Sequence, residues 1–278
     1  MSHVTLSNVS VSYPLFMSSG QRSVLAKAAK ILSFGGVRSK AGGQSYVDAL
    51  INVSINLQEN ARIGLIGRNG SGKSTLLKVL AGVNLPTRGR RDASGQVATM
   101  LSTMAGLGPE KTGRQNVRLM CDVFALGASR TEEIIEDIEE FTQLGQFFDL
   151  PVLSYSAGMQ VRLAFALSTC LPGDMLFIDE ALGAGDAQFL ERAAARLAAR
   201  MDKAKILAIA THSPADLERF CDCAIWMDRG RIVEVGDPMT VWANYSKFEI
   251  TTPPNTNIRV TWPPNAKSKQ KFEAATSD

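Results

Sequence analysis

The stretch GRNGSGKS, residues 67–74, decides the fold. It fits the pattern G-x-x-x-x-G-K-[ST], with an apolar run at residues 63–66 before it and a helix-like run at residues 71–82. Glycines let successive backbone N–H groups point at phosphate oxygens, and the start of a helix adds free donors and a favourable dipole. The strand–loop–helix context disfavours the alternative, a chance Gly-rich turn. We therefore expect a phosphate-binding loop here.

Each residue type in this loop has an expected task. Lys73 should reach the β- and γ-phosphates of a nucleotide, and the Ser74 hydroxyl should bind Mg²⁺. The sequence thus predicts ATP and Mg²⁺ as cofactors. The candidate nucleotide-binding positions of the loop are Gly67, Asn69, Gly70, Ser71, Gly72, Lys73, Ser74 and Thr75.

A second apolar run, residues 175–178, ends in two carboxylates, Asp179 and Glu180. Adjacent side chains on a strand point in different directions, which suits two separate roles. Asp179 is a candidate Mg²⁺ ligand, directly or through water, and Glu180 is a candidate general base that polarises the attacking water. The alternative, a strand that ends in a solvated acidic turn, is disfavoured beside a phosphate-binding loop.

Strand-like and helix-like segments alternate along the chain, which indicates an α/β fold with a parallel sheet. An Asp-Arg-Gly turn, residues 228–230, predicts a hairpin. The strand-like segments are residues 4–13, 49–57, 62–67, 175–178 and 205–210, and the helix-like ones are 71–82, most of 113–170 and 191–201.

Composition narrows the class of protein. Apolar residues make up 45% and charged residues 21%, as in ordinary globular domains, and a net charge of +3 gives no sign of a nucleic-acid partner. The four cysteines match neither a zinc site nor a disulfide framework, so we expect free thiols in a reducing cytosol. The N-terminal residues lack the pattern of a secretion signal, and no run of about 18 apolar residues predicts a transmembrane helix.

The stretch YSAGMQVR, residues 155–162, opens a helix about 20 residues before Asp179. Ser156 is a good N-cap, and Ala157 and Gly158 leave backbone N–H groups open at the start of that helix. Here the sequence resembles the ABC ATPase superfamily, whose signature is L-S-G-G-Q followed by a Q-R-containing helix. The positions that match are Ser156, Gly158, Gln160 and Arg162, whereas Ala157 and Met159 depart from the commonest form. In that family this surface binds the γ-phosphate held by a second subunit.

The resemblance assigns three more positions. Asp186 looks like the D-loop residue that contacts the partner subunit. His212, after a buried strand, looks like the switch histidine that touches the γ-phosphate and assists catalysis together with Lys73. Tyr13 looks like the N-terminal aromatic residue on which adenine stacks.

The resemblance also implies a domain plan: a RecA-like core, an N-terminal antiparallel β-subdomain and an inserted helical subdomain. We expect one ABC ATPase domain at residues 1–250, with the helical subdomain at about 100–168 and a basic insert at about 14–47. Residues 251–278, rich in Pro and polar residues, should form a short tail that is extended or disordered.

Within the superfamily, the sequence is similar to the ATPases of polysaccharide exporters for O-antigen, capsule and teichoic acid. The residue 155–166 signature and the stretch LSTMAGLGPEKTGRQN, residues 101–116, carry this likeness. No Gln lies between Gln96 and Gln115, and Ser102 or Thr103 takes the usual place of the Q-loop glutamine. The basic insert contains an amphipathic helical pattern at residues 24–32, which suits a membrane surface or its own domain.

The resemblance implies a peripheral protein on the cytoplasmic face of the inner membrane. Its partners would be a second copy of itself in a head-to-tail ATP sandwich and a multi-span membrane subunit that moves a lipid-linked glycan. Two alternatives remain: the ATPase of another exporter, for lipids or drugs, and a soluble ABC ATPase acting on DNA or ribosomes. A single phosphate-binding loop and the lack of a heptad run argue against the soluble type.

Overall fold

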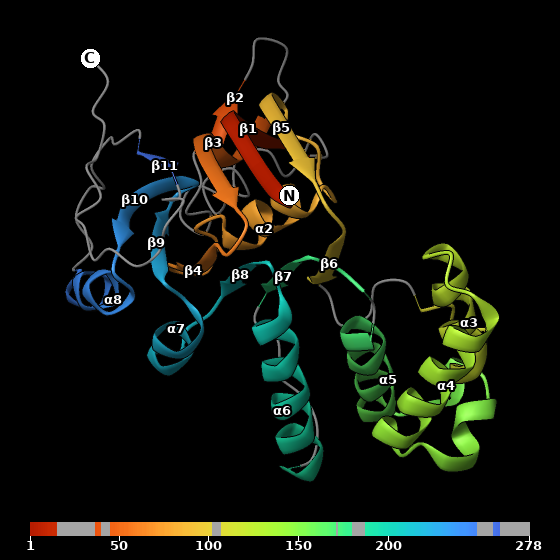
Figure 1. Cartoon of the computed structure of the whole chain (residues 1–278). Helices are drawn as coiled ribbons and strands as arrows, with labels where there is room; N and C mark the ends of the chain where they lie inside the picture. Colours follow the sequence, from red (N-terminus) through yellow and green to blue (C-terminus); the bar gives the residue numbers. More distant parts are fainter. Residues whose placement is uncertain are drawn as a thin grey trace. The chain divides into compact units, whose positions relative to one another are not determined.

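The structure is a computed structural model that describes residues 1–15, 37–39, 45–101, 107–170, 172–179, 187–248 and 258–261 (Figure 1). Its contacts divide the chain into two compact units, each described here by itself. Unit 1 comprises Met1–Val97, Asp174–Glu180 and Ala204–Asp278, and unit 2 comprises Ala98–Gly173 and Ala181–Lys203. The candidate phosphate-binding loop therefore belongs to unit 1, and the signature-like stretch belongs to unit 2.

The first sheet of unit 1 is built on two long strands, β1 (His3–Leu15) and β3 (Ser45–Gln58), which pair antiparallel. Its strand order is β11-β3-β1-β5, with β2 paired to β3. Apolar residues of β1 alternate toward the core until a bulge at Asn8, whose φ is 50°, shifts the register. The remaining strands are β2 (Val37–Ser39), β5 (Arg88–Ser94) and β11 (Arg259–Thr261), of which β11 runs parallel to β3.

The second sheet has the strand order β10-β9-β4-β8-β7-β6, and the pairs β9–β4, β4–β8 and β8–β7 are parallel. Its central strands are apolar and buried along nearly their whole length, as expected for strands covered on both faces. The strands are β4 (Arg62–Ile66), β6 (Val97–Met100), β7 (Met175–Asp179), β8 (Ile206–Ala210), β9 (Cys223–Asp228) and β10 (Arg231–Gly236).

Helix α2 (Lys73–Ala81) packs against strands of both sheets. It contacts β7 and β8 of the second sheet and β1 and β3 of the first. Its buried side chains include Leu76, Leu77, Val79 and Leu80. Helix α7 (Pro214–Phe220) packs on β4, and helix α8 (Pro238–Lys247) packs on β4, β9 and β10 (Figure 1). The helix that follows the loop is thus fixed between two layers of sheet.

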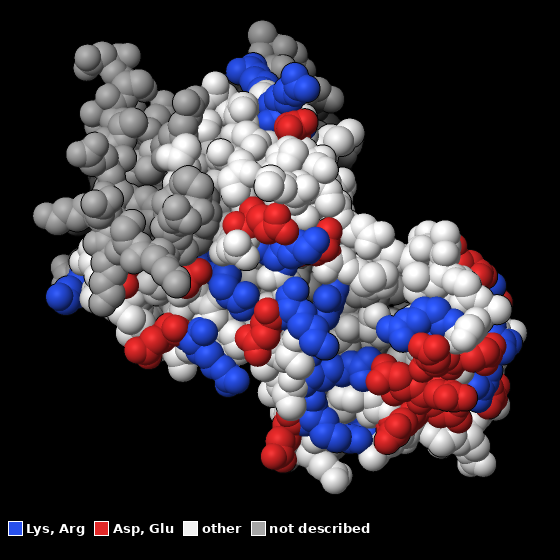
Figure 2. All heavy atoms as spheres, in the orientation of Figure 1, with Lys and Arg blue, Asp and Glu red and all other residues white. Residues whose placement is uncertain are grey.

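Unit 2 is helical. Its main helices are α3 (Gly113–Val123), α4 (Ala128–Thr142), α5 (Ala157–Cys170) and α6 (Ala187–Lys203), joined in part by the short 3₁₀ helices η1 (Gly145–Asp149) and η2 (Val152–Ser154). Its core includes Val117, Ile134, Ile138, Phe148 and Leu163. Figure 2 shows acidic side chains gathered on one surface of this unit. Helix α4 carries the carboxylates Glu132, Glu133, Glu136, Asp137, Glu139 and Glu140.

The predicted α/β class and the predicted hairpin at residues 228–230 are confirmed. One segment differs from expectation. Strand β3 begins at Ser45, four residues before the predicted start, because Ser45–Val47 pairs with the end of β1. Within the expected tail, the described residues Arg259–Thr261 form the short strand β11, in which Val260 is buried beside β3.

The amphipathic pattern at residues 24–32 lies outside the described residues. All four cysteines are free, as expected. No helix among the described residues combines the length and apolar character needed to cross a membrane.

Candidate functional site

The phosphate-binding loop begins at Gly67, directly after β4. Gly67 has a φ of 142°, and a Cβ atom there would lie 2.2 Å from the backbone oxygen of Met227 and 2.8 Å from Ser71 Oγ. No residue with a side chain fits, because both the conformation and the space exclude one. The loop therefore turns tightly against the neighbouring strand β9.

The loop ends at Gly72, the N-cap of α2, with a φ of 108°. A Cβ atom at Gly72 would lie 2.6 Å from the backbone oxygen of Ala49, so the loop also packs closely on β3. No side chain within the described part of the chain caps α2, which leaves its first backbone N–H groups directed out of the helix start. Such a helix N-terminus suits an anion.

Lys73 folds back over the loop. Its Nζ donates hydrogen bonds to the backbone oxygens of Gly67 at 2.7 Å and Arg68 at 3.2 Å, and the residue is only 8% exposed. These two hydrogen bonds hold the positive charge of Lys73 against the backbone of the loop.

Ser71 supplies a test of fit for a polyphosphate. Its Oγ is buried and has no hydrogen-bond partner among the described residues, although buried hydroxyls are normally paired. Its backbone is held, because its N–H donates to Arg68 at 3.1 Å and its carbonyl accepts from Gly230 at 2.8 Å. Around it, Asn69, Gly70 and Ser74 are exposed, so a ligand can reach the loop. These residues fit a polyphosphate.

Asp179 and His212 lie at the same edge of the sheet as the loop. The strand register aligns Asp179 of β7 with Ala210 of β8, and Ala210 with Leu65 of β4. The carboxyl ends of these three parallel strands therefore meet. Asp179 is half-buried, and exposed His212 follows β8 directly. The structure thus brings both predicted side chains to the edge from which the loop leaves.

The backbone around His212 is fixed by its two neighbours. The N–H of Thr211 donates to the Leu65 backbone oxygen at 3.3 Å, and Thr211 Oγ1 accepts from the Ser213 N–H at 3.0 Å. Ser213 caps helix α7 by accepting from the Asp216 N–H at 3.2 Å. The histidine is therefore presented on a short, well-anchored connection.

Tyr13 lies near the end of β1, where it pairs with Val47 of β3. It is 41% exposed, so its ring is accessible, and its hydroxyl accepts a hydrogen bond from Asn84 Nδ2 at 2.7 Å. An accessible aromatic ring whose polar end is tied to the protein suits stacking against a flat base.

The signature-like residues begin helix α5 in unit 2. Ser156 Oγ accepts from the Met159 N–H at 3.3 Å, as an N-cap does. Ser156 and Ala157 are exposed, and a Cβ atom at Gly158 would meet only Ser156 Oγ, at 4.0 Å. A cavity of about 540 Å³ adjoins them, lined by Gln143, Leu144, Phe147, Ser156, Gly158, Met159 and Arg162. The helix start is thus open and beside a cation.

The cation of this cavity, Arg162, is held by contacts within unit 2. It donates a hydrogen bond to the Thr142 backbone oxygen at 3.4 Å, and its guanidinium carbon lies 5.4 Å from the centroid of the Phe189 ring. These two contacts fix the position of the positive charge beside the start of α5.

Four predicted positions, Glu180, Asp186, Ser102 and Thr103, lie outside the described residues. The candidate general base, the D-loop residue and the two residues in the place of the Q-loop glutamine therefore stay predictions.

Sequence reasoning missed the contacts that support the loop. The turn between β9 and β10 was visible as Asp-Arg-Gly, but nothing in the sequence linked it to residues 67–74. In the structure, the Gly230 N–H donates to Ser71 and the Gly230 carbonyl accepts from Ile51, at 2.8 Å in both bonds. Beside it, burial raises the pKa of the Asp228 carboxyl, with Arg229 and Arg68 acting in the opposite direction. Nothing in the sequence indicated that Asn84 would bond to Tyr13 either.

Comparisons with known proteins agree with this geometry. Residues 50–183 match the family model described as ABC transporter. Among solved structures, the chain is similar to an ATP binding subunit of an ABC transporter, with a TM-score of 0.64, 20% identity and coverage of 87% of this chain and 93% of that one. A dimeric, ADP- and Pi-bound structure of the ATP-binding cassette MJ0796 gives a TM-score of 0.61, 20% identity and coverage of 84% and 98%. These likenesses confirm the predicted fold.

Curated relatives narrow the family. The chain is 37% identical to the O-antigen export system ATP-binding protein RfbB of Myxococcus xanthus, over 72% of this chain and 46% of that protein. It is 38% identical to the teichoic acids export ATP-binding protein TagH of Bacillus cereus, over 72% and 36%. The chain therefore spans less than half of the length of each of these two relatives.

A third relative is matched over nearly its whole length. The O-antigen export system ATP-binding protein RfbE of Yersinia enterocolitica is 35% identical over 84% of this chain and 98% of that protein. The chain therefore belongs to the ABC transporter family, in the group of ATP-binding proteins that includes those of O-antigen and teichoic acid export systems.

Proposed function

We propose that this chain is the ATP-hydrolysing subunit of an ABC exporter that moves a lipid-linked polysaccharide across the cytoplasmic membrane. The observation that carries the ATPase part is the loop itself. Buried Lys73 lies at the edge of the sheet where Asp179 and His212 also lie. Within the described part of the chain, Ser71 Oγ has no hydrogen-bond partner and no side chain caps the start of α2. The names of the relatives, O-antigen and teichoic acid export proteins, support the choice of cargo.

The residues of unit 1 would divide the work of hydrolysis. The loop N–H groups and Lys73 would hold the β- and γ-phosphates, and Tyr13 would stack on adenine. Ser74 and Asp179 would hold Mg²⁺, which neutralises phosphate charge when bound. Glu180 would accept a proton from the attacking water, and His212 would contact the γ-phosphate. The bond from the γ-phosphorus to the bridging oxygen of ADP breaks as the bond to water forms.

A second copy of the chain would complete each site. Ser156, Ala157 and Gly158 offer open N–H groups at the start of α5, beside Arg162, and such a surface binds an anion. A head-to-tail pair would place this surface of one copy on the nucleotide of the other, with Asp186 at the contact. The similar cassette MJ0796, which is dimeric when bound to ADP and Pi, supports this arrangement.

The membrane partner would be a multi-span subunit on whose cytoplasmic side this protein binds peripherally. ATP binding would close the pair, hydrolysis would reopen it, and the motion would drive the glycan path. The family leaves open an exporter of lipids or drugs. A soluble ABC ATPase acting on nucleic acid is the second alternative, and the export names of the relatives disfavour it.

The test is to express the Glu180→Gln variant with the products of neighbouring genes and identify what co-purifies in detergent. We expect ATP to trap a dimer bound to a multi-span membrane protein that carries lipid-linked glycan. The Lys73→Ala variant, which should bind no nucleotide, is the control for ATP dependence. If the ATP-trapped dimer is instead soluble and binds nucleic acid, the proposed ATPase activity stands and the proposed role in transport is wrong.

A further inference from the structure

Asn84 and Tyr13 form a polar contact that no part of the proposed mechanism uses. Asn84 Nδ2 donates to the Tyr13 hydroxyl at 2.7 Å, across 71 residues of sequence. Asn84 is half-buried, whereas Tyr13 is 41% exposed. The hydrogen bond therefore holds one end of a ring whose face stays open to a ligand.

The backbone of Asn84 is fixed by the end of helix α2. Gly82 closes the helix in the left-handed conformation, with a φ of 79°. The N–H groups of Val83 and Asn84 then both donate to the Lys78 carbonyl, at 2.9 and 3.1 Å. The amide of Asn84 thus projects from a rigid turn, and its position follows that of α2.

The segment that follows Asn84 is bonded to β1, the strand that carries Tyr13. The Thr87 N–H donates to the Ser10 carbonyl at 2.8 Å, and Thr87 Oγ1 accepts from the Ser12 N–H at 3.0 Å. Besides the hydrogen bond between Asn84 and Tyr13, two hydrogen bonds of Thr87 therefore join this segment to the backbone of β1. They keep Asn84 and Tyr13 at a fixed separation.

We infer that Asn84 is a positioning residue that orients the Tyr13 ring for stacking on the nucleotide base. The inference rests on the proposed function, in which ATP is the ligand. Helix α2 begins at Lys73, in the phosphate site, and ends three residues before Asn84. One rigid helix therefore sets the positions of both Lys73, which would bind phosphate, and Asn84, which holds the Tyr13 ring. An oriented ring loses less freedom when the base binds.

The test compares two ligands, MgATP and Mg-tripolyphosphate, which share the phosphates but not the base. For Asn84→Ala we expect the Kd of ATP to rise roughly 3- to 10-fold, the usual effect of one neutral hydrogen bond. The Kd of tripolyphosphate and the kcat at saturating ATP should stay at wild-type values. Leu85→Ala is the matched control, because Leu85 is the next residue and is 83% exposed.

Two further variants separate positioning from a merely structural role. Tyr13→Phe keeps the ring and removes the oxygen, so it should weaken ATP binding like Asn84→Ala, and the double variant should be no worse than either alone. Asn84→Asp should restore affinity, because a carboxylate accepts a hydrogen bond from the Tyr13 hydroxyl.

Two results would overturn the inference while leaving the ATPase intact. One is an unchanged ATP Kd in Asn84→Ala, and the other is an equal loss of affinity for ATP and tripolyphosphate. Wild-type protein that binds neither ligand would instead overturn the proposed function, and this inference with it.

Discussion

At the scale of single residues, burial distinguishes Lys73 from surface cations such as Arg118 and Arg130. Lys73 is 8% exposed and donates hydrogen bonds to two carbonyls of its own loop, while exposed arginines elsewhere in the chain form ordinary surface ion pairs. A buried ammonium is stable only where strong acceptors surround it. The loop carbonyls are such acceptors, and phosphate oxygens would take over part of this task when a nucleotide binds.

Asp228, which lies beside the turn that supports the phosphate-binding loop, is a buried carboxyl that lowers the stability of the fold. Its pKa is raised by burial, which means that the charged form is disfavoured in the folded chain. A carboxyl whose pKa is raised in the folded state does not lower the free energy of unfolding at pH values below its ordinary pKa. It lowers that free energy as the pH rises from the ordinary pKa through the raised pKa. Asp228→Asn keeps the shape and removes the charge. We therefore expect a Tm gain of about 2 °C at pH 7.5 that disappears toward about pH 4.

Thermal unfolding at several pH values checks this prediction. Asp122→Asn, on the exposed side of α3, removes one charge without changing a buried site and is the control. A gain for Asp228→Asn that is the same at every pH, or a loss at pH 7.5, would show that the burial of this carboxyl is compensated by its neighbours.

At the scale of elements, the phosphate-binding loop is supported by a hairpin turn more than 150 residues away in sequence, which is about the length of a whole domain. Gly230, with a φ of 75°, donates its N–H to Ser71, and a Cβ atom there would lie 2.7 Å from the Ala49 oxygen. The turn thus meets both the loop and β3, and its geometry requires glycine.

Gly230→Ala should therefore destabilise the chain by about 1–3 kcal/mol, because a Cβ atom both strains the turn and contacts the backbone. We also expect a weaker affinity for MgATP, because the hydrogen bond to Ser71 is displaced. Denaturant unfolding and ATP titration measure the two effects. Gly127→Ala is the matched control, since a Cβ atom at Gly127 meets nothing within 4 Å. Equal effects of both substitutions would contradict the support role.

The parts of the fold and of the candidate site that could be predicted from sequence are those with a local sequence pattern. The loop, strand β7 and the turn at residues 228–230 each carry their signal within about ten residues, because apolar periodicity and turn residues act locally. The contacts of Gly230 with Ser71 and of Asn84 with Tyr13 join segments far apart, and single Gly and Asn residues have no pattern that reveals a partner. The early start of β3 was missed because its first residues, Ser45–Val47, pair with β1 rather than enter the core.

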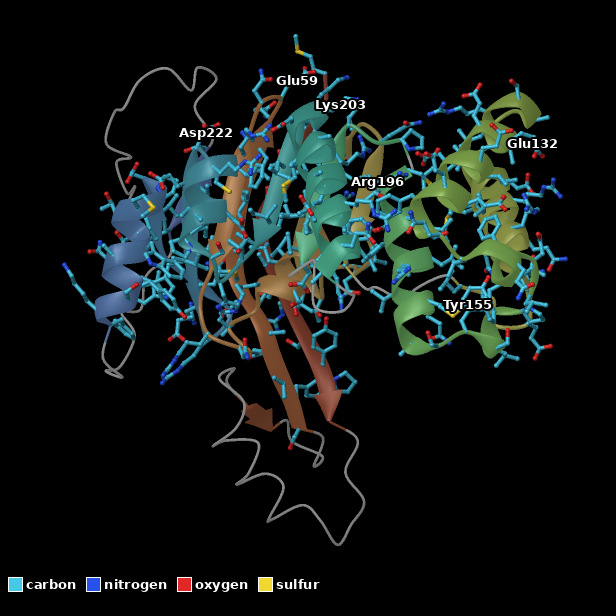
Figure 3. The ribbon with its side chains drawn as sticks, turned by 90° about the horizontal axis from the view of Figure 1, so that it is seen from below. Glu59, Glu132, Tyr155, Arg196, Lys203 and Asp222 are labelled. Carbon is cyan, nitrogen blue, oxygen red and sulfur yellow. The ribbon has the colours of Figure 1, made fainter. Side chains whose placement is uncertain are left out.

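At the scale of the whole molecule, the candidate site residues are divided between two units. Lys73, Asp179 and His212 belong to unit 1, and Ser156 and Gly158 belong to unit 2. Figure 3 labels Tyr155, the residue before Ser156 in the sequence. In the proposed function, the first set acts in one copy of the chain and the second set acts in its partner, so the ATPase would work only as a pair.

The measurement that tests this claim most directly mixes two inactive variants. Lys73→Ala lacks the phosphate lysine, and Gly158→Asp places a negative charge at the start of α5, where a Cβ atom has open space and the helix can still form. Random pairing makes about half of the dimers mixed, each with one intact site, so ATPase activity should return to about a quarter of the wild-type rate. Activity in the mixture no higher than in the separate variants would contradict the head-to-tail dimer.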